Sequence, residues 1–163
     1  MCRILALPPP VYARGMTRTM TGGCMCGDKR FSAEVESDEA YLCHCRMCQR
    51  ASGNMSLALF NLKKAAVTWT KGQPDAYASS PIAVRSHCAR CGTSLTFAFP
   101  ESQNMDLTVA SFDEPGYFRC TSHSGAESMH RHWLNTEGLE EERTEDQPHI
   151  VKKWMEATGK MPD

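Results

Sequence analysis

The sequence predicts a small, mainly β domain whose strands are held together by metal-binding cysteines. Several segments alternate apolar and polar residues with period two, which is the pattern of half-buried strands. Seven of the nine cysteines fall into tight groups with one or two residues between them. Such spacings suit chelation of a metal better than structural disulfides. Because many short strands bury limited apolar area, we expect metal cross-links to supply much of the stability.

The chain length of 163 residues suits one domain with a genuine core. We expect residues 1–20 to form a disordered extension, because three prolines interrupt a short apolar patch that fits neither a signal peptide nor a transit peptide. The domain itself is expected over residues 21–155. Residues 136–146, TEGLEEERTED, are strongly acidic, and we interpret them as a solvated surface.

The elements follow in chain order. Strands are expected in KRFSAEVES, AYLCHC, NMSLALF, AVTWTKG and MDLTVASF. RMCQRASG is expected to form one helical turn that ends near Gly53. SPIAVRSHC leads into CARCGTSLTFAF, where a cysteine turn precedes Leu95, Phe97 and Phe99 on one strand face. The turn DEPG is then followed by a less regular, histidine-rich segment.

A short C-terminal helix is expected near the end of the chain. PHIVKKWMEATGK begins with Pro148, a residue favoured in the first helical turn. Four apolar residues follow at helical spacing, namely Ile150, Val151, Trp154 and Met155. We interpret this segment as a docking helix.

Charge and hydropathy exclude two classes of partner. The formal net charge is −1 and the pI is about 6.6, so nothing indicates a nucleic-acid partner. No apolar run approaches the roughly 20 residues that a membrane span needs. The odd cysteine count and the grouped thiols favour a reducing compartment, and we expect the protein to be cytoplasmic.

The outer cysteine groups are a C-x-C pair and a C-x-x-C pair. Together they supply four thiolates, enough to close a tetrahedral zinc shell: Cys24, Cys26, Cys88 and Cys91. Gly27 and Gly92 follow these pairs and let the backbone turn so that amide N–H groups face the sulfurs. A zinc ion joining pairs about sixty residues apart would be structural.

The middle group is a triplet with the spacing C-x-C-x-x-C. Cys43, Cys45 and Cys48 supply three thiolates and leave one position of a zinc shell unfilled. Water or an external thiol could occupy that position, and an open position is typical of catalytic zinc. Zinc would favour the thiolate form of a bound thiol, which is the nucleophile that attacks an aldehyde.

A protein ligand is the alternative for the fourth position. His44 is adjacent, but on a strand its side chain points away from the faces used by its neighbours. The other candidates are His87, His123 and His132. In each case a hydrogen-bonded structural histidine is the simpler interpretation.

The blocks GGCMCGDKRF, CHCRMCQRASGN and HCARCGTSL, in this order and spacing, resemble the glutathione-dependent formaldehyde-activating enzyme family, whose domain is shared with centromere protein V. VASFDEPGYF and HRHWLNTEGLEE are similar to later parts of the family domain. The resemblance covers roughly residues 20–140. The commoner family form has a proline before the tryptophan, whereas here His132 precedes Trp133.

The resemblance implies an all-β zinc fold of the β-tent type with two zinc ions per chain. In the family the outer pairs bind a structural zinc and the triplet binds a catalytic-type zinc. The implied activity is formation of S-hydroxymethylglutathione from glutathione and formaldehyde, a carbon–sulfur lyase reaction. Glutathione carries two carboxylates, and the cations near the clusters in sequence are Arg46, Arg50, Arg85 and Arg90.

Two other functions are considered. The domain could be a non-catalytic zinc module that binds a partner. It could also be a redox enzyme of the methionine sulfoxide reductase type with Cys120 as nucleophile, although the C-x-C elements do not match the paired C-x-x-C turns of that family. By itself, Cys120 is expected to be a buried, inert strand residue. The sequence indicates neither the substrate nor the oligomeric state.

Overall fold

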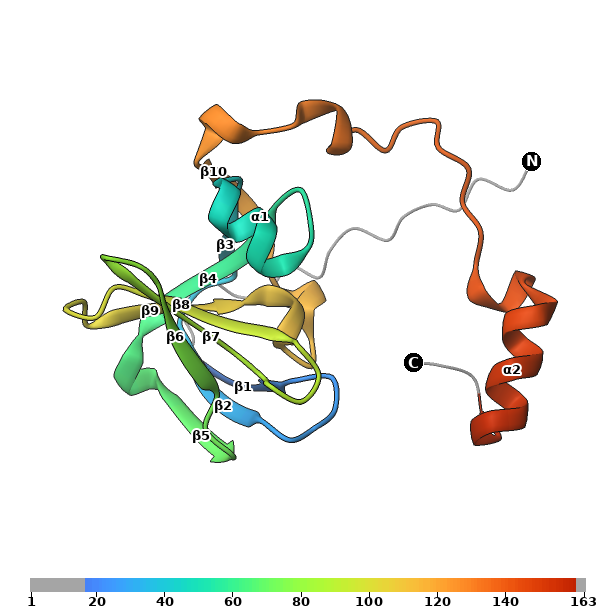
Figure 1. Cartoon of the computed structure of the whole chain (residues 1–163), viewed down its shortest axis with the longest axis horizontal. Helices are drawn as coiled ribbons and strands as arrows, with labels where there is room; N and C mark the ends of the chain where they lie inside the picture. The colour runs from blue at the N-terminus through green and yellow to red at the C-terminus, as the bar shows by residue number, and fades with distance from the viewer. Residues whose placement is uncertain (1–16, 161–163) are drawn as a thin grey trace. The chain divides into compact units, whose positions relative to one another are not determined.

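The computed structural model describes residues 17–160 (Figure 1). The chain divides into two compact units, one up to His130 and one from Arg131 onward. The first unit contains all the described strands. The second contains short 3-10 turns and one α-helix. The prediction of a mainly β protein is therefore confirmed.

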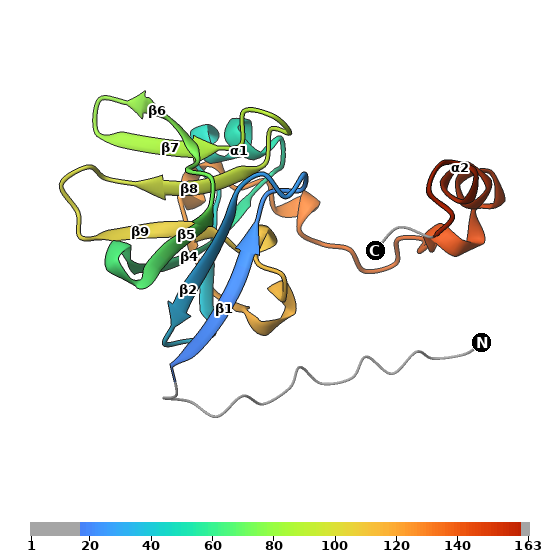
Figure 2. The same ribbon diagram turned by 90° about the horizontal axis from the view of Figure 1, so that it is seen from below.

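The strands of the first unit form two sheets (Figure 2). A three-stranded antiparallel sheet has the order β1-β2-β5, with the bounds Arg18–Gly23, Arg30–Val35 and Val67–Lys71. A seven-stranded sheet has the order β10-β3-β4-β9-β8-β7-β6, in which only the β10–β3 pair is parallel. In that order its strands span Arg119–Ser124, Glu39–Cys43, Leu57–Lys63, Asn104–Thr108, Ser94–Ala98, Ala83–His87 and Asp75–Ser80.

The remaining elements are short. In the first unit, α1 spans Arg46–Ser52 and 3-10 helices span Lys64–Ala66, Val109–Ser111, Pro115–Tyr117 and Ala126–Ser128. In the second unit, 3-10 helices span Arg131–Trp133 and Thr144–Asp146, and α2 spans Pro148–Thr158.

The main core joins the small sheet to one face of the large sheet. Phe31 on β2 is fully buried and packs with Phe60 on β4 and Leu107 on β9. The Phe31 ring makes edge contacts with Trp69 and Phe112, at centroid distances of 5.6 and 5.2 Å. The first pair lies within the small sheet, and the second joins that sheet to the segment that follows β9; both are the edge arrangement in which ring quadrupoles attract.

The opposite face of the large sheet carries the residues that meet α1. Directly paired residues on neighbouring strands share a face. The registers Tyr77↔Arg85, Arg85↔Phe97 and Phe97↔Asp106 thus place these four side chains on one face. Leu59 belongs to the same face and packs against the cysteine triplet. This face therefore positions the candidate site.

Helix α1 begins and ends where the sequence predicts. Cys45 is the N-cap, and its sulfur accepts a hydrogen bond from the Cys48 N–H at 3.4 Å. Gly53 ends the helix with φ +66°, a backbone conformation that costs glycine little, and its N–H bonds to the Gln49 carbonyl. The prediction of a turn ending near Gly53 is confirmed, although the helix is seven residues long.

The structure also extends the predicted elements. β1 begins at Arg18 and Met20 is buried, so residues 18–20 pair with β2 and do not belong to an extension. Residues 1–16 lie outside the described part of the chain. β1, β6 and β10 were not predicted as strands. Every residue of β10 is exposed and β6 is mostly exposed, so neither carries the apolar alternation that marks a strand.

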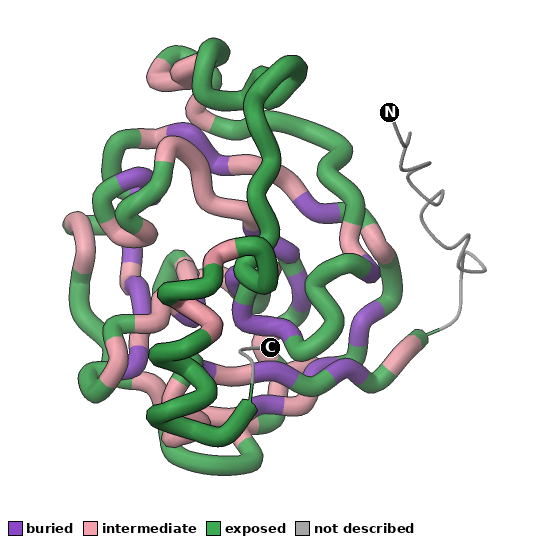
Figure 3. The backbone as a smooth tube through the Cα atoms, turned by 90° about the vertical axis from the view of Figure 1, so that its right-hand side faces the viewer, coloured by how far each residue is buried: buried purple, intermediate pink, exposed green. Residues whose placement is uncertain are grey.

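The second unit contains the predicted C-terminal helix. α2 has Pro148 in its first turn and ends at Gly159, which has φ +72°. The domain was expected over residues 21–155, and residues 131–155 of that range belong to the second unit. No residue from 131 to 160 is buried; Figure 3 shows the buried stretches of the described chain in purple. Among the described residues, no helix has the length and apolar character of a membrane span.

Candidate metal centres

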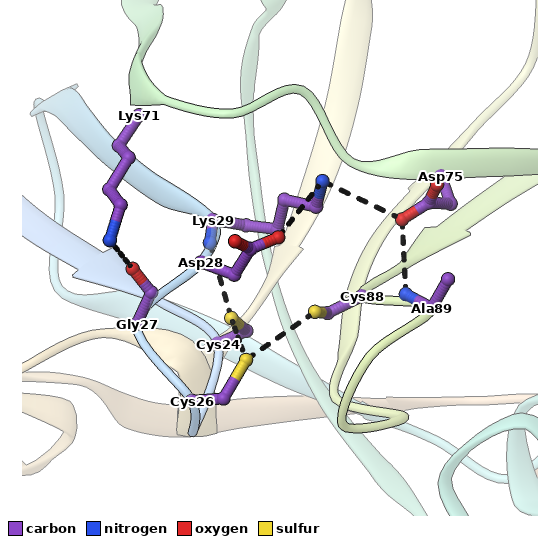
Figure 4. Close-up of polar contacts among 9 residues, drawn as sticks. All are labelled: Cys24, Cys26, Gly27, Asp28, Lys29, Lys71, Asp75, Cys88 and Ala89. Carbon is purple, nitrogen blue, oxygen red and sulfur yellow. Dashed lines mark hydrogen bonds and ion pairs between the residues drawn. The ribbon is translucent and has the colours of Figure 1, made fainter.

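The outer cysteine pairs meet in space. The sulfurs of Cys24, Cys26, Cys88 and Cys91 all lie within 4.8 Å of one another. The first pair follows β1 and the second follows β7, so the cluster joins the small sheet to the large one. The Cys26 sulfur is 3.5 Å from that of Cys24 and 3.8 Å from that of Cys88 (Figure 4). Four sulfurs at these separations could hold one metal ion.

The turns around this first cluster have the predicted glycine geometry. Gly27 has φ +70° and donates its N–H to the Cys24 carbonyl at 3.0 Å. Gly92 has φ +76° and donates to the Cys88 carbonyl at 2.8 Å. The first turn directs the Lys29 N–H to the Cys24 sulfur at 3.3 Å. Such N–H groups stabilise negative charge on a thiolate.

Local hydrogen bonds also favour the thiolate at Cys91. Its sulfur lies 3.2 Å from the Thr93 hydroxyl. Hydrogen bonds from this hydroxyl and from the Thr93 N–H lower the pKa of Cys91 to about 5. Because a thiolate is the form that binds a metal, this lowered pKa favours binding at neutral pH.

The cysteine triplet lies where β3 runs into α1. The sulfurs of Cys43, Cys45 and Cys48 lie within 4.8 Å of one another. Cys43 and Cys48 are buried, whereas Cys45 is partly exposed. A hydrogen bond from the Cys48 thiol lowers the pKa of Cys43 to about 5, and the same interaction raises the pKa of Cys48. The triplet could hold a second metal ion.

Among the described residues, no histidine nitrogen lies within 4.8 Å of all three triplet sulfurs. His44 is fully buried, and its Nε2 lies 2.9 Å from Nδ1 of His123 on β10. His87 ends β7, and His132 belongs to the second unit. The expectation that His44 faces away from its cysteine neighbours agrees with this arrangement.

A buried arginine stands beside the triplet. The Arg85 side chain on β7 donates from Nη2 to the Cys48 sulfur at 3.3 Å. Its Nη1 donates to the Ser79 hydroxyl, and its guanidinium lies over the Phe97 ring at 4.8 Å from the centroid. Arg85 is only 3% exposed. A positive charge in this place compensates negative charge on the sulfurs. Burial distinguishes Arg85 from Arg46, Arg50 and Arg90, which are exposed.

Segment 119–128 packs against the residues that carry the triplet. The Gln49 amide, which is buried, donates to the carbonyls of His44 at 2.7 Å and Ser128 at 3.0 Å. Gly125 lies so close to Cys45 that an added Cβ would stand 2.7 Å from the Cys45 nitrogen. The His44 N–H bonds to the Ser124 carbonyl at 2.8 Å. This segment therefore fixes the backbone that carries the triplet.

Sequence reasoning missed Gln49 and Gly125. One signal for Gln49 was available, because positions 45, 48 and 49 fall on one face of a helix that begins at residue 46. Gly125 gave no signal, since its role depends on the parallel pairing of β10 with β3.

The eight cysteines among residues 17–160 are free, and none forms a disulfide. Cys120 lies on a strand as expected but is exposed, which corrects the expectation that it is buried. It belongs to neither sulfur cluster. Cys2 lies outside the described residues.

Known proteins similar to this chain include a family, a curated relative and a solved structure. The family described as glutathione-dependent formaldehyde-activating enzyme matches residues 19–133. A curated relative from Schizosaccharomyces pombe, named an uncharacterized lyase, is 31% identical over 83 residues, which are 51% of this chain and 60% of that protein. The match thus spans less than two thirds of that relative. A crystal structure of a Rhodobacter sphaeroides protein is similar with a TM-score of 0.50 and 20% identity, over 58% of this chain and 88% of that one, which is a likeness of fold.

Proposed function

Because the chain belongs to the glutathione-dependent formaldehyde-activating enzyme family, we propose that it is a zinc-dependent, carbon–sulfur lyase-like enzyme. It adds a small thiol of the glutathione type to an aldehyde such as formaldehyde, or catalyses the reverse cleavage. The proposal includes a β-tent type of zinc fold, two zinc ions per chain and a cytoplasmic location. Its partners are the small thiol and the aldehyde, with no nucleic acid and no membrane.

The observation that carries this proposal is the difference between the two clusters. The first cluster offers four sulfurs, which complete a tetrahedral shell. The triplet offers three, and no histidine, aspartate or glutamate among residues 17–160 joins it as a fourth ligand. A three-ligand site with room for a small molecule is the usual form of a catalytic zinc site.

The sulfur separations fit zinc. A Zn–S bond of about 2.3 Å in a tetrahedral shell puts neighbouring sulfurs about 3.8 Å apart. In the first cluster the Cys26 sulfur lies 3.5 Å from that of Cys24 and 3.8 Å from that of Cys88. We assign Cys24, Cys26, Cys88 and Cys91 to the structural ion and Cys43, Cys45 and Cys48 to the second ion.

The proposed addition needs no oxidant. A new bond joins the thiol sulfur to the carbonyl carbon, the C=O π pair moves to oxygen, and the thiol proton ends on that oxygen. Zinc at the triplet would supply Lewis acidity that favours the thiolate form of the entering thiol. Arg85 offsets negative charge beside Cys48, and Gln49 holds the backbone of α1 against segment 119–128. Partly exposed Cys45 marks the side from which a thiol can enter.

The test is a rate measurement on zinc-loaded protein. Exchange between formaldehyde and its glutathione adduct is followed by ¹³C NMR, with and without enzyme. We expect the wild-type protein and Cys120→Ser to accelerate exchange equally, and Cys45→Ser to lose the acceleration. Equal rates with and without the wild-type protein, at two zinc ions per chain, would leave the non-catalytic zinc module as the better description. Loss of activity in Cys120→Ser would favour the redox enzyme.

A further inference from the structure

A cavity of about 270 Å³ lies beside the triplet, between the end of α1 and strands β6 and β7. Arg50, Tyr77, Arg85 and His87 line it, together with small residues. Arg85 connects this cavity to the triplet, because its Nη2 also bonds to the Cys48 sulfur. A group bound in the cavity and a ligand at the triplet would therefore contact the same guanidinium.

Two residues of the cavity lining each carry a buried, unsatisfied nitrogen atom. Nε of Arg85 and Nδ1 of His87 are both buried, and neither has a hydrogen-bond partner. Buried polar groups are nearly always hydrogen-bonded, so an orphaned one indicates a partner of another kind, such as a ligand or an ion. The Arg85 side chain as a whole is 97% buried, the complement of its 3% exposure, so bulk water does not replace the missing bond.

The charges around the cavity favour an anion. Its lining contains the two cations Arg50 and Arg85 and no acidic residue. The nearby carboxylate of Asp75 is already bound to the Ala89 N–H at 3.0 Å and lies 3.8 Å from the Lys29 ammonium group (Figure 4). Within the described part of the chain, Arg50 forms no ion pair. Arginine recognises carboxylates through paired N–H donors, and Arg50 is free to do so.

We propose that this cavity binds a carboxylate of the thiol substrate, with Arg50 as the binding residue and Arg85 as the link to the triplet. The inference rests on the proposed function, because it places the sulfur of the same molecule at the triplet. It selects Arg50 and Arg85 from the four arginines near the clusters and leaves Arg46 and Arg90 outside the cavity lining.

The test compares three probes by calorimetric titration of zinc-loaded protein. Glutathione carries both the thiol and free carboxylates, its diethyl ester has the carboxylates masked, and S-methylglutathione has the sulfur blocked. Wild-type protein is compared with Arg50→Gln and with the control Arg90→Gln, which removes the same charge from an exposed arginine outside the cavity.

We expect glutathione to bind about tenfold more tightly than its diethyl ester, the effect of one charge-assisted contact. Arg50→Gln should remove this preference and Arg90→Gln should retain it. Equal binding of glutathione and its ester would overturn the cavity assignment while leaving thiol binding intact. If S-methylglutathione binds as tightly as glutathione, and this binding depends on Arg50, the cavity stands and the sulfur role at the triplet is overturned. Absence of binding by all three probes overturns both.

Discussion

The Arg85 guanidinium donates to the Cys48 sulfur at 3.3 Å, although the two residues are 37 positions apart in the chain. Both side chains are buried, at 3% and 2% exposure. In such surroundings a charge-assisted hydrogen bond is strong, and losing either partner leaves the other without compensation. The pair links strand β7 to helix α1 and places a permanent cation beside the triplet.

Replacing Arg85 should weaken metal binding at the triplet selectively. Hydrogen bonds to charged groups contribute about 1.5–3 kcal/mol, so Arg85→Gln should reduce zinc affinity there by about tenfold or more. Competition with a chromophoric chelator measures this, and the four-sulfur cluster of the same molecule is the internal control. A parallel loss of zinc from both clusters would mean that Arg85 supports the fold and not the triplet.

Gly125→Ala should displace Cys45. Both Gly125 and Gly53 have left-handed backbones, with φ +64° and +66°, so alanine costs about 1 kcal/mol at either position through backbone strain. An added Cβ at Gly125 would meet the Cys45 backbone, whereas at Gly53 it has nothing within 4 Å. We expect Gly125→Ala to lower zinc occupancy of the triplet and Gly53→Ala to leave it unchanged, as measured by metal analysis after dialysis. Equal occupancy in the two variants would refute the close packing of Gly125 on Cys45.

The two clusters should differ in their effect on stability. Cys88→Ser removes a ligand from the cluster that joins the two sheets, and we expect a loss of several kcal/mol in unfolding free energy, because structural zinc binding is coupled to folding. Cys48→Ser should lose one zinc ion per chain and keep a cooperative thermal transition. Circular dichroism and metal analysis on the same samples measure both effects. A Cys48→Ser protein that is unfolded would contradict this division between the clusters.

Asp113 should contribute stability that disappears in acid. It bonds to the Arg30 guanidinium, with 2.9 Å between Nη1 and Oδ1, and to the Thr21 hydroxyl at 2.6 Å. The bond from Arg30 holds the pKa of Asp113 below its usual value. A lowered folded-state pKa means that the contribution is complete above the unfolded pKa of about 3.9 and is lost as the pH falls through the folded value.

We therefore expect Asp113→Asn to be less stable than wild type at pH 7, with the gap closing below about pH 4. The gap should be about 0.5 kcal/mol, since both side chains are partly exposed and solvent screens the pair. Urea unfolding at a series of pH values measures it, and both proteins share the acid sensitivity of the cysteine clusters. Glu101→Gln, at an exposed carboxylate with no ion pair among residues 17–160, is the control. A gap that is constant from pH 7 to pH 3 would show that the ionised form of Asp113 does not matter.

The grouping of seven cysteines, the helix that ends at Gly53 and the C-terminal helix could all be predicted from the sequence. These features depend on residues within a few positions of one another, where chain geometry limits what can form. The alternating strands were also predictable, because each buries one face and therefore carries period two. The strands β6 and β10 were not, because exposed edge strands are held by main-chain hydrogen bonds that leave no pattern in the side chains.

Tertiary structure alone decided which side chains surround the triplet. Arg85 and Gly125 reach it through the order and register of strands in the seven-stranded sheet, and one residue of slippage would turn Arg85 to the opposite face. The sequence by itself determined which atoms can bind metal. The pairing of distant strands determined the charge and the cavity beside these atoms. The contacts of Arg85 with the triplet and the cavity form only when the strands of the sheet pair in this register.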